Sequence, residues 1–253
     1  MRELEETARR VLRALRRIDN VKYSNLRVAV IGGLARMHYD PRGRVTEDVD
    51  FFVDIPGFSI PTELKTAIEA LDGFSQTREV FYYAYDTPEG KHVSHKVDFI
   101  ARNVCPYRPS AAQRIRDIPQ GVIPYISRKD LVVFKIESCG VRKQTKQGLI
   151  DAIDAETLLS MVKTPLALTP QQQAIVEDRI EDVMSHCKHR PRWWWRKQLG
   201  LPEEDEEDEE KEGREGDNEG DKEGGKEGDE GSSEEDVEED TEEDNTLLYF
   251  SSC

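Results

Sequence analysis

The stretch from residue 28 to residue 54, VAVIGGLARMHYDPRGRVTEDVDFFVD, carries the pattern that decides the fold. An apolar run ends at Gly32 and Gly33, a polar loop follows, and a second apolar run contains Asp48 and Asp50. Side chains alternate across a strand, so two acids one residue apart point to the same face. Glycines between a strand and a helix let a phosphate approach the backbone closely. The stretch is therefore suited to a divalent cation and a phosphate.

A third carboxylate stands in a similar setting. Asp98 is an isolated acid within the apolar run 97–100. An unpaired carboxylate in such a run is costly, so a partner is expected. Mg²⁺ is one such partner, because it is usually held by one or two carboxylates together with substrate phosphates. If the strand of Asp98 lies beside the strand of Asp48 and Asp50, all three acids can meet at a pair of metal ions suited to phosphoryl displacement.

The charge of the chain is unevenly distributed. The 253 residues include 52 acidic and 36 basic side chains, a formal net charge of −16. Residues 203–245 alone hold 26 acidic and 4 basic residues, which leaves a net charge of +6 on the remainder. A segment of low hydrophobicity and high charge cannot bury enough surface to offset its ordering entropy. We therefore expect a disordered acidic tail at 201–253, preceded by a core of ordinary size.

Cysteine usage and hydropathy bear on the compartment. The four cysteines, at positions 105, 139, 187 and 253, form no Cys-x-x-Cys pair and match no zinc-site spacing. The N-terminal segment is charged, and no apolar run approaches the length needed to cross a bilayer. These features predict an intracellular protein, cytoplasmic or nuclear, with no membrane partner.

The order of predicted elements favours an α/β or α+β core followed by a layer of helices. Period-two runs predict strands at 26–31, 48–54 and 121–126, with an antiparallel hairpin formed by 77–85 and 91–101. Apolar spacing predicts helices at 2–20, 34–39, 61–71, 129–139, 149–162 and 170–187. A capping box, Ser127 with Asp130, marks the start of the fourth helix. We expect a core at 1–126, a helical region at 127–200 and the tail at 201–253.

Together these motifs resemble the signature of the DNA polymerase beta-like nucleotidyltransferase superfamily. The resemblance rests on IGG at 31–33, TEDVD at 46–50 and Asp98. It is strongest to small members, namely the minimal nucleotidyltransferases and the nucleotidyltransferase toxins of abortive-infection systems. It covers about residues 21–159, and it extends to a helix with an acid-leucine step and to a following basic stretch, at Asp130, Leu131, Lys135, Arg142, Lys143, Lys146 and Asp151.

The resemblance implies a small mixed sheet flanked by helices, and an activity. A nucleoside monophosphate would pass from a nucleoside triphosphate, such as ATP, to an acceptor hydroxyl of an RNA, a protein or a small molecule, with Mg²⁺ as cofactor. In the family the glycine motif holds the triphosphate, the Asp-x-Asp pair binds magnesium, and a third acid is a metal ligand or base. By resemblance, Gly32, Gly33 and Lys135 are nucleotide-binding, Asp48, Asp50 and Asp98 are metal ligands, and Asp98 is also catalytic.

Two features depart from the family's pattern. The gap between Gly33 and Asp48 is toward the long end, with an extra loop at 40–43. The family's Lys-Asp pair is replaced by Lys-Gln-Gly at 146–148, ahead of Asp151. Both departures lie outside the residues expected to bind metal.

Several features admit two interpretations. A rival function is a catalytically inactive protein of the same fold, which binds nucleic acid or a basic protein through its basic body and acidic tail. The arginines of the N-terminal helix fit either a surface helix packed on the core or a phosphate contact. The three tryptophans fit either a segment that packs on the domain or a surface for a partner or a single strand, at Trp193, Trp194 and Trp195.

Overall fold

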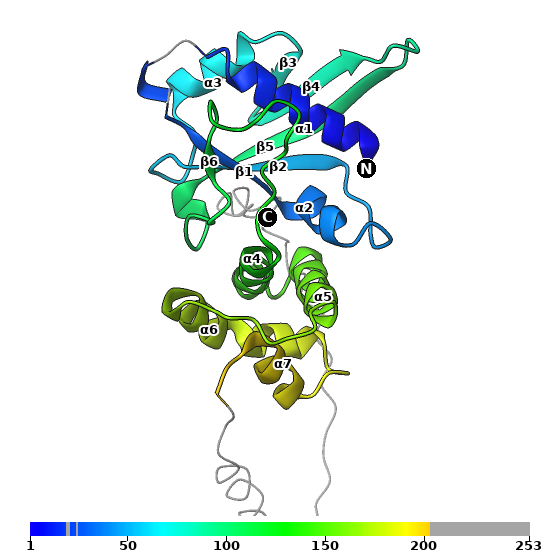
Figure 1. Ribbon diagram of the computed structural model, residues 1–253, viewed down its shortest axis with the longest axis vertical. Coiled ribbons are helices and arrows are strands. Elements are labelled where there is room, and N and C mark those ends of the chain that lie inside the picture. Colours follow the sequence, from blue (N-terminus) through cyan, green and yellow to red (C-terminus); the bar gives the residue numbers. More distant parts are fainter. Residues whose placement is uncertain (19–20, 24, 203–253) are drawn as a thin grey trace, which may run out of the picture. The chain divides into compact units, whose positions relative to one another are not determined.

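A single mixed sheet organises the part of the chain that the structure describes. The computed structural model describes residues 1–202 except 19, 20 and 24, so the acidic run predicted to be disordered lies outside the described residues. The strands are β1 (Arg27–Ile31), β2 (Asp48–Val53), β3 (Phe74–Thr77), β4 (Val80–Asp86), β5 (His92–Ala101) and β6 (Gln113–Arg114). Their order in the sheet is β3-β4-β5-β2-β1-β6 (Figure 1). Strand β2 runs parallel to β5 and antiparallel to β1, which makes the sheet mixed, as expected.

The helices follow the predicted order, with one addition. They are α1 (Arg2–Leu15), α2 (Gly32–Tyr39), α3 (Thr62–Glu69), α4 (Arg128–Val141), α5 (Lys146–Ser160), α6 (Pro170–His186) and α7 (Arg192–Leu199). Helix α4 packs against both α5 and α6, and α2 contacts α4 and α5 (Figure 1). Strands and helices of both kinds, with helices last, confirm the predicted α+β class and its C-terminal helical layer.

Alternation of side chains along the central strands divides the core into two clusters. Val49, Phe51 and Val53 of β2 pack with the apolar face of α1 and with α3. Phe52, on the opposite face, packs with residues of α4 and α5. Because Asp48 and Asp50 share the parity of Phe52, the acids lie on the face of the sheet that meets the helical layer.

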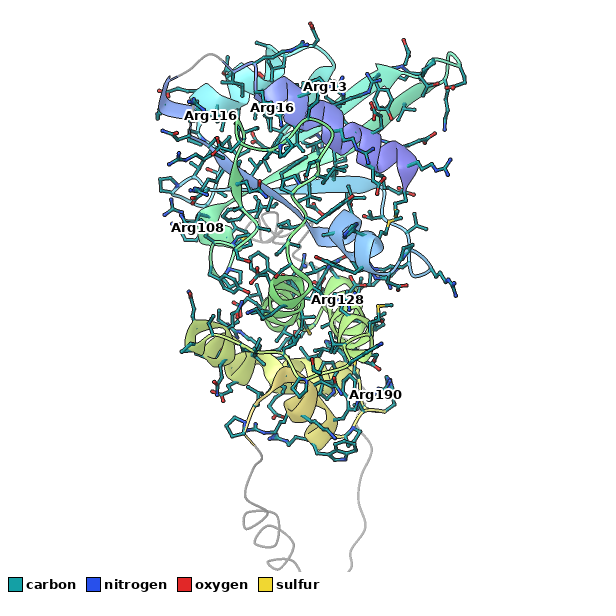
Figure 2. The ribbon with its side chains drawn as sticks, in the orientation of Figure 1. Arg13, Arg16, Arg108, Arg116, Arg128 and Arg190 are labelled. Atoms are coloured by element: carbon teal, nitrogen blue, oxygen red, sulfur yellow. The ribbon has the colours of Figure 1, made fainter. Side chains whose placement is uncertain are left out.

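Helix α1 is a packing helix whose described arginine contacts are made within the protein. It ends at Leu15, five residues before the predicted boundary. Arg10 pairs with Glu6 at 2.8 Å, and its guanidinium lies 4.2 Å from the centre of the Tyr85 ring. Arg16, labelled with Arg13 in Figure 2, donates a hydrogen bond of 3.1 Å to the carbonyl of Ile115. The packing interpretation of this helix is therefore the one that the described contacts support.

Two local predictions need correction. The segment 121–126 makes only an isolated parallel bridge, between Val30 and Tyr125, because β6 occupies the start of the same edge of β1. The Ser127 hydroxyl does accept a hydrogen bond of 3.0 Å from the Asp130 amide. The Asp130 carboxylate, however, accepts a hydrogen bond of 2.8 Å from the Ser110 hydroxyl instead of folding back on the helix start. The predicted capping box is therefore only half formed.

The tryptophan and cysteine residues are mainly packing residues. Trp195 is fully buried in the helical layer, whereas Trp193 is 63% exposed. Burial raises the pKa of Cys139 and of Cys187 to about 12, which keeps both thiols neutral. None of the described helices is both long enough and apolar enough to cross a membrane.

Candidate metal centre

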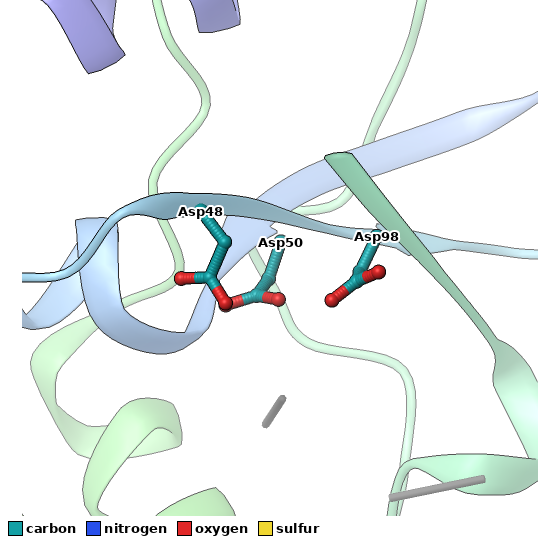
Figure 3. A group of neighbouring side chains, drawn as sticks. All are labelled: Asp48, Asp50 and Asp98. Atoms are coloured by element: carbon teal, nitrogen blue, oxygen red, sulfur yellow. The ribbon is translucent and has the colours of Figure 1, made fainter. Parts of the chain in front are cut away.

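Three carboxylates from two adjacent strands converge at one point. Asp50 of β2 is the direct partner of Asp98 of β5 in the parallel register, and Asp48 lies two residues before Asp50 on the same face. Each acid offers an oxygen atom, and these oxygens all lie within 4.8 Å of one another. Figure 3 shows the three side chains directed to the same space beside the sheet. The structure therefore brings together the three acids that the sequence selected.

Glycine is required at positions 32 and 33 because the start of α2 lies very close to the side chains of Asp50 and Thr46. Gly32 has a φ of +62°, a region that side chains other than glycine rarely adopt. A Cβ atom on Gly32 would fall inside the carboxylate of Asp50, and one on Gly33 would fall against the hydroxyl of Thr46. The Gly33 amide lies 3.4 Å from Oδ2 of Asp50. The start of α2 is thus in direct contact with the acid cluster.

Thr46 orients the first acid. Thr46 lies in the loop between α2 and β2, and its hydroxyl donates a hydrogen bond to Oδ1 of Asp48. The Thr46 amide also lies 3.4 Å from the Met37 sulfur, which ties the loop back to α2. Asp48 is half-buried and Asp50 is buried, so the two carboxylates differ in their access to solvent.

A lysine accompanies the third acid. Nζ of Lys96 lies 2.7 Å from Oδ2 of Asp98, and the lysine side chain is 26% exposed. Burial lowers the pKa of Lys96, but its hydrogen bond with Asp98 and the charges of Asp98, Asp48 and Asp50 outweigh burial and raise that pKa above its usual value. The ammonium is therefore held in its charged form beside the cluster.

A cavity of about 860 Å³ opens beside the acids. Its wall includes the first residues of α1, the loop 45–48, and side chains from two strands, among them Tyr82, Ser94 and Lys96. Asp48 lies on this wall, so the cavity reaches the acid cluster. Its volume is in the range of pockets that take small molecules such as nucleotides.

The residues present fit a hard divalent cation. The donor set consists of carboxylate oxygens, which suit Mg²⁺ and Mn²⁺ rather than metals that prefer sulfur or imidazole. Three negative charges held this close repel one another, and a bound cation relieves that repulsion. Convergence of three carboxylates is therefore compatible with a divalent metal ion.

The structure does not bring Lys135 to the acid cluster, and the nucleotide-binding role expected of it stays a prediction. Its side chain is 1% exposed, and its ammonium lies 2.7 Å from Asp151 and 3.1 Å from Asp154, both on α5. Arg142 also pairs with Asp151. Lys135 and Arg142 thus pair with α5, whereas Lys143 of the same basic stretch pairs with Asp182 of α6 at 3.3 Å.

The same buried group of charges reaches the loop that precedes β2. Arg44 forms a two-pronged contact with the Asp154 carboxylate, with distances of 2.9 and 2.6 Å. Arg36 of α2 lies 3.3 Å from Asp154 and 2.8 Å from Asp40. The extra loop noted in the sequence is therefore fastened to the helical layer.

Sequence reasoning missed two residues of the cluster, Thr46 and Lys96. Both precede a predicted acid by two positions, Asp48 and Asp98 respectively. Period-two alternation puts such residues on the same face as the acid, so this spacing was the available signal. For Lys96 the structure bears this out, since it lies opposite Asp48 in the register of β2 and β5.

Comparison with known proteins found structural likeness only. No protein-family description and no curated protein matches the sequence. The chain is similar to the crystal structure of an antigenic nucleotidyltransferase-like protein from Paracoccidioides brasiliensis, with 18% identity, a TM-score of 0.46, and coverage of 74% of this chain and 93% of the other. It is also similar to the Helicobacter pylori protein JHP933, with 15% identity, a TM-score of 0.36, and coverage of 74% and 80%.

Proposed function

We propose that the protein is a magnesium-dependent nucleotidyltransferase that moves a nucleoside monophosphate from a nucleoside triphosphate to an acceptor hydroxyl. One observation carries the proposal: three carboxylates from two paired strands present oxygen atoms within 4.8 Å of one another. The direct contact of this cluster with a glycine pair at the start of α2 supports it, since the same point then suits both a cation and a phosphate.

The roles follow from position. Asp48 and Asp50 would hold magnesium, and Asp98 would complete its protein ligands. Magnesium bound there would neutralise phosphate oxygens and align the attacking and leaving oxygens. Gly32 and Gly33 would receive the β and γ phosphates, because the first turn of a helix offers N–H groups and the positive end of its dipole.

Asp98 is the acid that the resemblance assigns to the acceptor hydroxyl. Asp98 is half-buried, whereas Asp50 is buried, so an incoming hydroxyl can reach Asp98 more readily than Asp50. In the proposed reaction the hydroxyl oxygen bonds to the α-phosphorus. The bond from the α-phosphorus to the oxygen that bridges the α- and β-phosphorus atoms breaks. The electron pair leaves with pyrophosphate, and the hydroxyl proton passes to the carboxylate of Asp98.

The cavity beside Asp48 supports binding of the organic part of a substrate. Tyr82 supplies an aromatic ring on its wall, which suits stacking of a base. The nucleoside triphosphate and the acceptor, whether RNA, protein or small molecule, are both part of the proposal.

Incorporation of α-labelled nucleotide tests the function. Wild-type protein is incubated with labelled ATP, CTP, GTP or UTP, with RNA, protein or small-molecule hydroxyl acceptors, and with Mg²⁺ or a chelator. We expect Mg²⁺-dependent incorporation that Asp48→Asn and Asp50→Asn abolish. The control is Asp86→Asn, which removes a carboxylate that is 75% exposed at the end of β4 and should leave incorporation unchanged.

The rival function predicts the opposite pattern. If wild-type protein incorporates no label with any triphosphate and acceptor, the enzyme proposal fails. Equal binding of RNA or histones by wild type and Asp50→Asn, without incorporation, would favour an inactive protein that binds nucleic acid or a basic partner. The basic partner expected of the acidic tail concerns residues 203–245, which lie outside the described residues.

A further inference from the structure

Lys96 is placed within the acid cluster by the sheet itself. It is the direct partner of Asp48 in β2 and of Tyr82 in β4, and it shares the face of Asp98, two residues along β5. Its ammonium lies 2.7 Å from Oδ2 of Asp98. A backbone register fixes this proximity, so it does not depend on the choice of a surface rotamer alone.

The position of the ammonium is that of a cation ligated by a carboxylate. Oδ2 of Asp98 lies within hydrogen-bonding distance of the ammonium, and Asp48 is the register partner of Lys96 on the neighbouring strand. The lysine also lines the cavity that reaches Asp48. A positive group at this place fills the space of a second metal ion and supplies the positive charge that the ion would bring.

The charges of the cluster also favour a single divalent ion. The carboxylates of the cluster carry three negative charges, and Lys96 contributes one positive charge, so these four side chains have a net charge of −2. One divalent cation brings the four to neutrality, whereas two would leave a surplus of two positive charges. Excess charge of either sign in a half-buried site is unfavourable.

We propose that Lys96 is a built-in cation of this site: the free protein holds one divalent ion between the carboxylates, and the Lys96 ammonium takes the place of a second ion beside Asp98. The inference rests on the metal site of the proposed function and changes its stoichiometry from a pair of ions to a single ion. Removing the lysine charge opens the second place.

Counting bound Mn²⁺ tests this inference without any measurement of activity. The electron paramagnetic resonance signal of free Mn²⁺ is followed during titration of the full chain at physiological salt. Sites of the cluster are those that disappear in the double variant Asp48→Asn/Asp50→Asn, which removes the contribution of other acids of the chain. We expect one such site in wild type and two in Lys96→Met, with Lys96→Gln as a second variant if Lys96→Met does not fold.

Lys91→Met is the matched control. Lys91 belongs to the same hairpin, is 61% exposed and pairs with Glu3, so its replacement should leave one site. Two sites in wild type, or a single site in whichever Lys96 variant folds, would overturn the inference and leave the proposed transferase intact. No cluster site in wild type would overturn the inference and the metal site of the proposed function together.

Discussion

Two groups of aspartates are located where the sheet meets the helical layer, and they are neutralised in different ways. The first group consists of Asp40, Asp151 and Asp154. Four basic side chains pair with these acids and bring the net charge of the group to +1, namely Arg36, Arg44, Lys135 and Arg142. The second group, the three acids of the proposed metal site, has a net charge of −2 when Lys96 is included.

The difference separates a structural role from the proposed ligand-binding one. Asp151 and Asp154 are fully buried, and arginine or lysine groups satisfy their oxygens. Asp50 is also buried, but Asp48 and Asp98 of the same group are only half-buried, and Asp48 borders a cavity. A buried charge persists only with partners inside the protein, whereas convergent acids beside a cavity can take their counter-charge from a bound ion.

Removal of Asp154 should have the largest effect on stability. Asp154→Ala leaves Arg36, Arg44 and Lys135 without the carboxylate that they share, and breaking a buried pair typically costs about 3–5 kcal/mol. Urea unfolding measures the change in the free energy of unfolding. Asp182→Ala, which removes a partner of the exposed Lys143, serves as the control and should cost about 1 kcal/mol or less. Equal effects of the two variants would contradict the structural role.

A substitution at Gly32 should have the next largest effect. Gly32→Ala introduces both a left-handed backbone for alanine and a clash with the Asp50 carboxylate, and such strain costs on the order of 1–3 kcal/mol. Gly90→Ala is the matched control, because Gly90 has a φ of +78° but an added Cβ meets nothing within 4 Å. Thermal unfolding should show a smaller loss for Gly90→Ala, about 1 kcal/mol. If the two losses are equal, the contact with Asp50 is not what requires glycine at position 32.

Replacement of an acid of the proposed metal site should change stability far less in the absence of metal. Asp50→Asn keeps the shape of the side chain and removes one of three mutually repelling charges. We expect the free energy of unfolding in chelator to stay within about 1 kcal/mol of wild type, or to rise by that amount. A loss near that of Asp154→Ala would mean that Asp50 is structural, and would end the contrast between the two groups.

The smallest effect concerns pH. Burial raises the pKa of Asp154, but its hydrogen bond with Arg44 and the charges of Lys135 and Arg44 outweigh burial and hold that pKa below its usual value. Burial lowers the pKa of Lys135, but the charges of Asp151 and Asp154 outweigh it and raise that pKa. An acid whose pKa is lowered by folding stops stabilising the folded state only as pH falls through its folded pKa. A lysine whose pKa is raised by folding stops stabilising it only as pH rises through its folded pKa.

The stabilisation from this pair should therefore be constant from about pH 5 to about pH 10, between the ordinary pKa values of aspartate and lysine. Urea unfolding across that range measures it as the difference in unfolding free energy between wild type and Asp154→Asn. A difference that changes by more than about 1 kcal/mol near neutral pH would show that another titrating group controls the buried network.

The sequence was sufficient to predict where the acids of the cluster lie, but not where the basic residues lie. Asp48, Asp50 and Asp98 could be selected because each interrupts an apolar strand, and two-residue spacing fixes the face on which each lies. Lys135 lies on a helix, where the direction of a side chain depends on how helices pack, and the sequence does not specify that α5 faces it.

The strands at the edge of the sheet could not be predicted from the local sequence pattern either. Strand β6 is two residues long and its residues are exposed, so it carries no alternation to detect. The segment around Tyr125 has a strand-like composition, but it reaches β1 at a single bridge. Pairing partners at a sheet edge are chosen by tertiary contacts rather than by propensity.

The most direct test of the contrast between the two acid groups is the change in unfolding free energy that Mn²⁺ produces in wild type and in Asp50→Asn. Ions that bind folded and unfolded chains equally contribute nothing to this change, so acids elsewhere in the chain do not obscure it. At a Mn²⁺ concentration of 100 times the dissociation constant, wild type should gain about 2.7 kcal/mol and Asp50→Asn much less. Equal gains in the two proteins, or no gain in wild type, would contradict the assignment of Asp48, Asp50 and Asp98 to a metal site.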